Sequence, residues 1–119
     1  MNTQEIIKLK ILSQYLYLNT SDFFYKFFNK SLLHNIIIME IFLKNNIDGI
    51  SFEKLCLSIP KSLGSRSTIQ SLLKIGLDKK IINKIVNKND KRIKNYFLSG
   101  ESIIKLQDWV KKQKIIFNS

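Results

Sequence analysis

The sequence contains one cysteine, one histidine and one proline among its 119 residues, and only four glycines. The single cysteine, Cys56, excludes a disulfide within the chain and a thiolate metal cluster. The sole histidine, His34, lies in an apolar stretch with no acid at ligand spacing, so we expect a packed, hydrogen-bonded side chain. The glycines, at 49, 64, 76 and 100, form no nucleotide-binding loop. The sequence therefore predicts no metal, no cofactor and no enzymatic activity.

Long apolar runs are also absent. The most apolar stretch, 32–43, is 12 residues long and is interrupted by His34 and Glu40, whereas a membrane span needs about 20 residues. Residues 1–10 lack the apolar core of a signal peptide. Leucine and isoleucine surround Cys56, which indicates a buried thiol in a reducing compartment. These features favour a cytoplasmic protein without a membrane partner.

Acidic residues are scarce as well: nine acids oppose 20 basic residues, which gives a net charge of +11. Such a charge points to a polyanionic partner, although an AT-rich genome also enriches lysine, so position is more informative than number. Ten basic residues fall within 61–94, opposed there only by Asp78 and Asp90. Both arginines, Arg66 and Arg92, lie in this segment. Arginine is the planar, bidentate donor that groove recognition favours.

Hydrophobic periodicity and turn residues predict a mainly α fold with a small β-hairpin, that is, an α+β protein. We expect one domain over residues 1–119, divided into N-terminal helices (1–30), a helix-turn-helix with a wing (31–99) and a C-terminal helix (100–119). The expected helices are 4–18, 23–28, 31–45, 52–59, 65–78 and about 100–114. The hairpin has strands at 80–87 and 92–98 around a turn at 88–91.

Local residue types predict where these elements begin and end. Gly49 is free to take a positive φ in the turn after 31–45, and Ile50 can add a short strand. Ser51 is an N-cap, and Pro60 ends the helix that follows. We expect Gly64 to supply a sharp bend, and Ser65 or Ser67 to cap helix 65–78.

The apolar residues near the two ends of the chain suggest a contact with a second copy. The first helix is expected to be amphipathic through positions 6, 7, 9, 12, 16 and 18, with Tyr15 and Tyr17 beside them, and the last helix to bury Ile103, Ile104, Leu106, Trp109, Val110 and Gln113. Five aromatic residues lie within 23–28. They either meet a second subunit or wedge between the first helix and the core; a small-molecule pocket among the rings is less favoured. The apolar tail 115–117 again indicates a subunit contact.

A basic helix followed by a basic hairpin is what a protein presents to two neighbouring grooves of DNA. An ordinary solvated helix face is an equally good interpretation of 65–78 alone, and the hairpin shifts the balance towards DNA. The candidate contacts are short polar and cationic side chains. They are Ser65, Arg66, Ser67, Thr68, Gln70, Ser71 and Lys74 on the helix, and Lys88, Asp90, Lys91, Arg92 and Lys94 on the wing.

The element order and the wing sequence resemble MarR-type winged-helix regulators over residues 31–114. In that family an Asp-x-Arg motif in the wing is followed by a Leu-Thr pair that leads into the last helix. Asp90, Arg92 and Leu98 match this pattern, and Ser99 replaces the threonine. The sequence departs from the family at Lys80, where a glycine is usual, and in a longer turn at 61–64.

The resemblance implies a division of roles within the chain. Asp90 would stiffen the wing by accepting hydrogen bonds from Arg92 or from backbone amides, and Arg92 would reach the minor groove. Ser67 and Thr68 match the polar start of the family's recognition helix. Members are typically symmetric dimers whose terminal helices pair, with effectors bound between the dimerisation and DNA-binding regions. A small-molecule effector is compatible with this sequence but not required by it.

These observations together predict a winged helix-turn-helix protein that binds double-stranded DNA sequence-specifically, as a homodimeric transcription regulator. Helix 65–78 would enter the major groove and wing 80–98 would lie on the adjacent minor groove. One alternative is a winged-helix protein–protein module that docks a partner through 23–28. Another is a replication or packaging factor of mobile-element origin that uses the same DNA surface.

Overall fold

The computed structural model describes the backbone of residues 2–18 and 22–118 and the side chains of residues 2–12 and 22–114. It confirms the prediction of a mainly helical fold with a small hairpin, and it has the winged-helix architecture. The elements are α1 (Thr3–Leu18), α2 (Phe23–Phe28), α3 (Leu32–Lys44), β1 (Ile50–Ser51), α4 (Phe52–Ser58), α5 (Arg66–Asp78), β2 (Ile82–Val86), β3 (Lys94–Leu98) and α6 (Gly100–Asn118).

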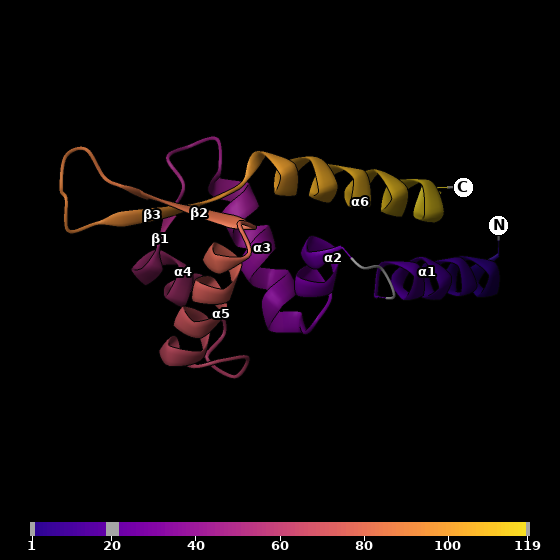
Figure 1. The fold of residues 1–119 in the computed structure, drawn as a ribbon. Coiled ribbons are helices and arrows are strands. Elements are labelled where there is room, and N and C mark those ends of the chain that lie inside the picture. The colour runs from indigo at the N-terminus through magenta and orange to yellow at the C-terminus, as the bar shows by residue number, and fades with distance from the viewer. Residues whose placement is uncertain (1, 19–21, 119) are drawn as a thin grey trace.

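The elements form an elongated body of 52 × 29 × 25 Å with α3 near its centre. The β2–β3 hairpin projects from one end, and α4 and α5 pack beside its base (Figure 1). Helices α1 and α6 contact each other and extend side by side from the opposite end. The hairpin and the terminal helices are therefore at opposite ends of the molecule.

Helix α3 forms the centre of the core because its apolar residues point in almost every direction. Ile37, Ile38 and Ile41 are completely buried, as expected for a helix that is hydrophobic nearly all round. Ser31 caps this helix by accepting a hydrogen bond from the amide of His34. Neighbouring elements contact α3 from several directions: α2, α4 and the strands β1 and β3.

The aromatic residues of α2 wedge inside the chain. Phe24, Phe27 and Phe28 are buried, and the ring of Phe28 meets that of Trp109 on α6 edge-to-face, with 5.0 Å between their centroids. Phe23 remains 60% exposed. Of the two interpretations left open by the sequence, the intramolecular one is confirmed for these buried rings, which need no second subunit to cover them.

The sheet has the order β1-β3-β2 with antiparallel pairing, so the predicted short strand at Ile50 is present. Two side chains fasten its base to the turn after α3: Asn45 Oδ1 accepts from the Leu98 amide at 2.7 Å, and Asn95 Nδ2 donates to the carbonyl of Asp48 at 2.8 Å. Gly49 has φ +74°, as predicted, and a Cβ there would lie 2.7 Å from the carbonyl oxygen of Tyr96. Only glycine fits this close approach of backbone to backbone.

The hairpin differs from the prediction in its boundaries. The strands are shorter than 80–87 and 92–98, and the turn covers 87–93. The reason is the side chain of Asn87, which accepts hydrogen bonds from the amides of Asn89 and Asp90 and so starts the turn early. Lys80 precedes the strand with φ +60°. This left-handed position is where the family resemblance expects glycine.

Gly64 lies in the predicted turn without a positive φ, and a Cβ there would lie 2.6 Å from a methyl group of Leu33, so close packing accounts for the glycine. Two predictions about the last helix were wrong. Helix α6 continues to Asn118 instead of ending near 114. Ile104 and Val110 are 68% and 38% exposed, because α6 buries its opposite side, which carries Ser102 and Leu106.

Helix α1 does not bury its predicted apolar stripe within the chain. Ile7, Leu9 and Leu12 of that stripe are 51%, 38% and 53% exposed, and Ile11, outside the stripe, is 63% exposed. The predictions for Tyr15, Leu16, Tyr17 and Leu18 and for the tail 115–117 fall outside the described side chains. None of the helices in the described part of the chain combines the length and the apolar character that crossing a bilayer requires.

His34 is a packed, hydrogen-bonded histidine, as predicted. It is 7% exposed, its Nδ1 lies 2.6 Å from Ser31 Oγ, and its ring packs edge-to-face on Phe27 at 4.8 Å. Burial, with a smaller contribution from the charge of Lys30, lowers the pKa of His34 below its ordinary value of 6.5. The protonated form is therefore disfavoured in the folded state.

This burial makes stability depend on pH near neutrality. Between the lowered pKa and about 6.5 the unfolded chain binds a proton that the folded chain does not, so the free energy of unfolding falls with decreasing pH, by at most about 1.4 kcal/mol per pH unit. We expect urea unfolding to show stability falling as the pH is lowered below about 6.5. His34→Gln should remove most of this dependence, because no other histidine is present. An equal slope in wild type and variant would contradict the assignment.

Candidate nucleic-acid interface

Helices α4 and α5 form the helix-turn-helix. Ser51 caps α4, which ends before Pro60, and Ser65 caps α5 by accepting a hydrogen bond from the amide of Thr68 at 3.2 Å. The turn between them therefore covers 59–65. The buried residues of α5 are Ile69, Leu72, Leu73 and Gly76, and they hold its other face towards solvent. The predicted helix 65–78 is confirmed, with Ser65 as its cap.

The exposed start of α5 carries a cluster of hydroxyl groups. Ser65 Oγ lies 3.1 Å from Ser67 Oγ and 3.0 Å from Thr68 Oγ1, and Ser71 Oγ donates to the carbonyl of Ser67. Gln70 and Lys74 are also exposed. A hydroxyl both donates and accepts, so this cluster can bond to a base edge or to a phosphate.

Arg66, the first residue of α5, is held by the neighbouring helix. Its two Nη atoms donate to the two carboxylate oxygens of Glu53 at 2.9 and 2.5 Å. The guanidinium carbon also lies 5.1 Å from the ring centroid of Phe52, a stacking distance. The hydrogen bond from Arg66 lowers the pKa of Glu53, and Glu53 in turn raises the pKa of Arg66. The sequence predicted Arg66 as a base-contacting residue, but not this pairing.

The wing contains a second arginine–carboxylate pair within its turn. Asp90 Oδ1 accepts from the amide and Nε of Arg92 at 3.0 and 3.1 Å, and Oδ2 accepts from Nη2 at 3.1 Å. These bonds lower the pKa of Asp90, the side-chain bond having the largest effect. The side chain of Arg92 is 90% exposed all the same. Asp90 thus shapes the turn as the family resemblance implies, with Arg92 facing solvent.

One cleft of about 480 Å³ joins α5 to the wing. Gln70 from α5 lines it together with Arg92 and Lys94 from the wing, so three predicted residues from two separate elements share one hollow. The other residues along it are Ser51, Phe52, Glu53, Lys84, Ile93 and Tyr96. The cleft is a surface that can present hydrogen-bond donors and positive charge to the same ligand.

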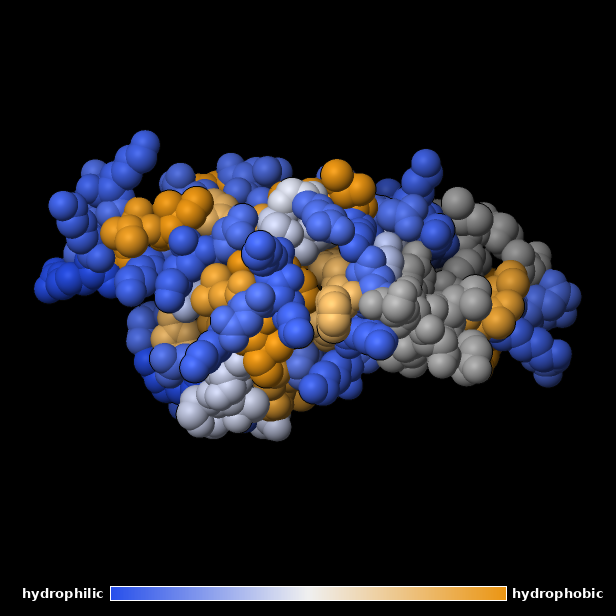
Figure 2. All heavy atoms as spheres, viewed as in Figure 1, coloured by the Kyte–Doolittle hydropathy of each residue, from blue (hydrophilic) through white to orange (hydrophobic). Residues whose placement is uncertain are grey.

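The structure does not bring all the predicted residues into this cleft. Lys88 lines a separate hollow of about 330 Å³ along the hairpin, with Ile85 and Val86. Figure 2 shows hydrophilic side chains at the tip of the hairpin, at the left, and hydrophobic ones next to them. The remaining predicted residues are exposed on α5 or the wing but do not line the cleft. They are Ser65, Arg66, Ser67, Thr68, Ser71, Lys74 and Lys91. Asp90, which is half-buried in the wing turn, does not line the cleft either.

Three residues of this region were missed by the sequence analysis: Phe52, Glu53 and Lys84. Lys84 could have been found, because it is one of the ten basic residues of 61–94 and lies within the first predicted strand of the wing. Glu53 gives no such signal. It lies 13 residues before Arg66, and only the geometry of the turn between the helices brings the two together.

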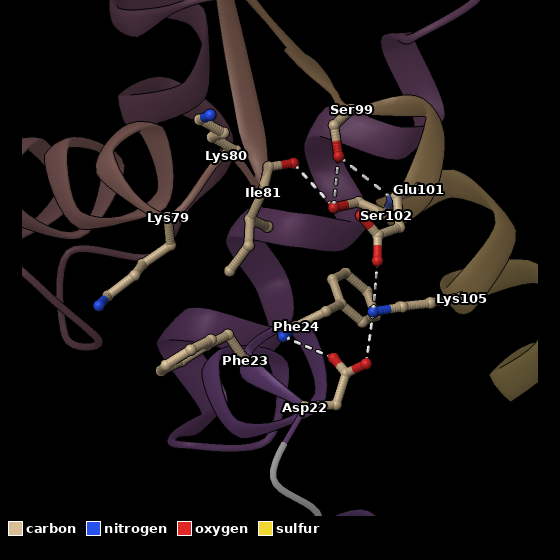
Figure 3. Close-up of a pocket in the computed structure, with 10 residues that line it drawn as sticks. All are labelled: Asp22, Phe23, Phe24, Lys79, Lys80, Ile81, Ser99, Glu101, Ser102 and Lys105. Carbon is tan, nitrogen blue, oxygen red and sulfur yellow. Dashed lines mark hydrogen bonds and ion pairs between the residues drawn. The ribbon is translucent and has the colours of Figure 1, made fainter.

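A smaller hollow of about 270 Å³ lies between α2, the end of α5 and the start of α6 (Figure 3). Lys105 bridges Asp22 and Glu101 there, and Lys79 lies over the ring of Phe23 at 4.6 Å. The polar groups are thus already paired with one another, and the volume is below the roughly 300–1,000 Å³ usual for ligand pockets. The ion pair of Lys105 with Asp22 connects α6 to the start of α2. No ligand is assigned to this hollow.

The groups that support metal or thiol chemistry are not assembled here. Burial raises the pKa of Cys56, and the opposing effect of Arg66 is smaller, so this cysteine is not an activated thiolate. Within the described residues no three acids, histidines or cysteines lie close enough together to hold a metal ion.

Comparison with solved structures identifies the fold. Staphylococcus aureus MepR in complex with DNA superimposes with a TM-score of 0.69 at 17% identity, over 97% of this chain and 81% of MepR. MepR bound to ethidium bromide gives 0.62 at 16% identity, over 99% and 76%. A variant of Lactococcus lactis ZitR gives 0.54 at 12% identity, over 99% and 80%.

No protein-family model and no curated protein matches this sequence. At identities of 12–17% the structural likeness establishes a shared fold. These neighbours are winged-helix proteins of the MarR type, so the resemblance inferred from Asp90, Arg92 and Leu98 is confirmed at the level of the fold.

The hydrogen bonds by which Asp90 holds Arg92, called the wing clamp here, lead to a first prediction about this surface. Asp90→Ala removes the acceptor of the bond from the Arg92 amide, so that amide should exchange its hydrogen at least about threefold faster, while the core amides keep their protection. Native-state hydrogen exchange monitored by NMR measures this directly. Lys91→Ala, in the same turn, is the control and should leave the rate unchanged. Equal protection of the Arg92 amide in wild type and Asp90→Ala would contradict the clamp.

Proposed function

We propose that the protein binds double-stranded DNA sequence-specifically and regulates transcription. The observation that carries this proposal is the single cleft that Gln70 of α5 shares with Arg92 and Lys94 of the wing. A neutral bidentate side chain suited to an adenine edge thus lies beside two cations suited to phosphates. MepR, which has the same fold, has been solved in complex with DNA.

The dimensions of α5 suit a major groove. Its 13 residues give a length of about 20 Å at 1.5 Å per residue, and its exposed hydroxyl cluster is at the N-terminal end, where recognition helices meet base edges. The wing would then lie along the neighbouring minor groove. There the exposed guanidinium of Arg92 would meet the negative potential of narrow A·T stretches.

We propose further that two copies act together through their α1 and α6 ends. Ile7, Ile11 and Leu12 of α1 and Ile104 of α6 are more than half exposed in the single chain, and Figure 2 shows hydrophobic side chains on α1 at the right. These helices lie at the end opposite the wing. A two-fold pairing there would leave both α5 helices free to enter successive major grooves.

Of the competing functions, the protein–protein module is less well supported. A protein–protein module docking through 23–28 would need that segment at the surface, and only Phe23 among its phenylalanines is mostly exposed. A replication or packaging factor would use the same DNA-binding surface. A small-molecule effector is not required by this proposal.

Two substitutions distinguish contacts that bind any DNA sequence from contacts that recognise a particular base. Arg92→Ala should weaken binding to any duplex roughly fivefold to tenfold at about 0.1 M salt and make the salt dependence shallower, because the wing loses the cation that enters the negative potential of the minor groove. Gln70→Ala should instead relax preference at one base position, at a cost of about 1–3 kcal/mol for the preferred site. Fluorescence anisotropy on a site selected from a random DNA pool, and on a scrambled duplex, measures both.

Lys26→Ala, an exposed cation on α2, is the matched control and should leave affinity and slope close to wild type. If Arg92→Ala binds as tightly as wild type at physiological salt, the wing is not in contact with DNA. If selection enriches no sequence at all, the proposal of sequence-specific binding fails.

The dimer is tested by adding charge to the exposed face of α1. Ile11→Asp should weaken self-association by tenfold or more, because a carboxylate would be buried in an apolar interface, while the circular dichroism spectrum stays unchanged. Sedimentation velocity across a concentration series measures this. Leu57→Asp alters an 86% exposed leucine on α4 and should not affect association. A wild-type protein that stays monomeric at high micromolar concentration would contradict the dimer.

A further inference from the structure

Glu53 is the only carboxylate among the described residues that line the cleft between α5 and the wing. Three cations line the same cleft: Lys84, Arg92 and Lys94. Glu53 belongs to the first turn of α4 and accepts from both Nη atoms of Arg66. An acid that lines a cleft with three cations opposes binding of a polyanion, so its position there requires an explanation.

The pairing leaves Arg66 able to bind some acceptors and not others. A guanidinium has five N–H donors, and Glu53 engages two of its nitrogens while Phe52 packs against its carbon. The remaining N–H groups can donate to a neutral base edge while the carboxylate stays in place. A phosphate that approached the same groups would lie beside the charge of Glu53, and like charges at close range repel.

The two carboxylate–arginine pairs differ in the elements that they join. Asp90 and Arg92 are two residues apart and form their pair within one turn. Glu53 and Arg66 come from different helices, and their side chains are 68% and 59% exposed. An exposed pair of this kind adds little to stability, so its main effect is on what Arg66 can bind.

We propose that Glu53 determines specificity by holding Arg66 away from phosphates and presenting it to base edges. This inference rests on the proposed DNA-binding function. Non-specific duplex binding, which consists almost entirely of phosphate contacts, is then weakened more than binding at a preferred site. Glu53 acts through Arg66 and is a positioning residue.

The test compares Glu53→Gln, Arg66→Gln and the double variant with wild type. The probe is a random-sequence duplex titrated by anisotropy between about 50 and 200 mM salt, beside a site selected by the wild-type protein. Glu53→Gln should bind the random duplex roughly fivefold to tenfold more tightly at about 0.1 M salt, with a slope steeper by about 0.9, because Arg66 now neutralises one more phosphate. The ratio of preferred-site to random affinity should fall.

The double variant decides whether the effect passes through Arg66. It should bind the random duplex like Arg66→Gln alone. Asp108→Asn is the matched control: it makes the same charge change in an i,i+4 pair with Lys112 on α6 and should leave affinity and slope at the wild-type values. Melting temperatures of all variants, measured in parallel, show whether folding has changed.

Three outcomes overturn the inference. In the first, Glu53→Gln leaves the random-duplex affinity unchanged. In the second, it tightens binding equally with and without Arg66, which would mean that Glu53 acts only by repelling the DNA. In the third, Glu53→Gln lowers the melting temperature and weakens binding, which would mean that the Glu53–Arg66 pair only holds α4 and α5 together. In all three cases wild-type binding is intact, so the proposed function stands. If the wild-type protein binds no duplex at about 50 mM salt, the proposed function fails, and this inference fails with it.

Discussion

Burial of the central isoleucines of α3 is the constraint on which the rest of the molecule depends. Ile37, Ile38 and Ile41 have no exposed surface, so elements must cover the helix from several directions, and α2, α4, β1 and β3 all contact it. Gly64 packs on Leu33 at the start of the same helix. The helix-turn-helix, the sheet and the aromatic segment are thereby placed relative to one another, and the cleft between α5 and the wing follows from that placement.

Both arginines of the sequence are paired with a carboxylate before any ligand binds. Arg66 is held by Glu53 across the helix-turn-helix, and Arg92 by Asp90 within the wing turn. Each pairing restricts a flexible side chain to fewer conformations, which lowers the entropic cost of a later contact. The lysines of the same surface provide charge with less geometric restriction. Directional and non-directional donors thus occur together on α5 and the wing.

The candidate site was predictable in part. Composition and position indicated the basic segment, and α5 and the wing are where the sequence placed them. That Gln70, Arg92 and Lys94 share one cleft could not be derived, because it depends on how the hairpin packs against two helices. The pairing of Arg66 with Glu53 could not be derived either, because an ion pair between residues 13 positions apart leaves no local signal in the sequence. Lys88 faces a different hollow, which charge counting does not reveal.

The sequence by itself determined the elements and most of their ends, because helix caps and turn residues act within four positions: Ser31, Ser51 and Ser65 each cap a helix through their own side chain. It also determined the left-handed turn at Gly49. Tertiary structure alone decided which apolar residues are covered, as the exposed Ile11 and the buried Phe28 show. The physical reason is that burial is a property of surfaces brought together from distant parts of the chain, whereas hydrogen bonds at helix ends are made by neighbours.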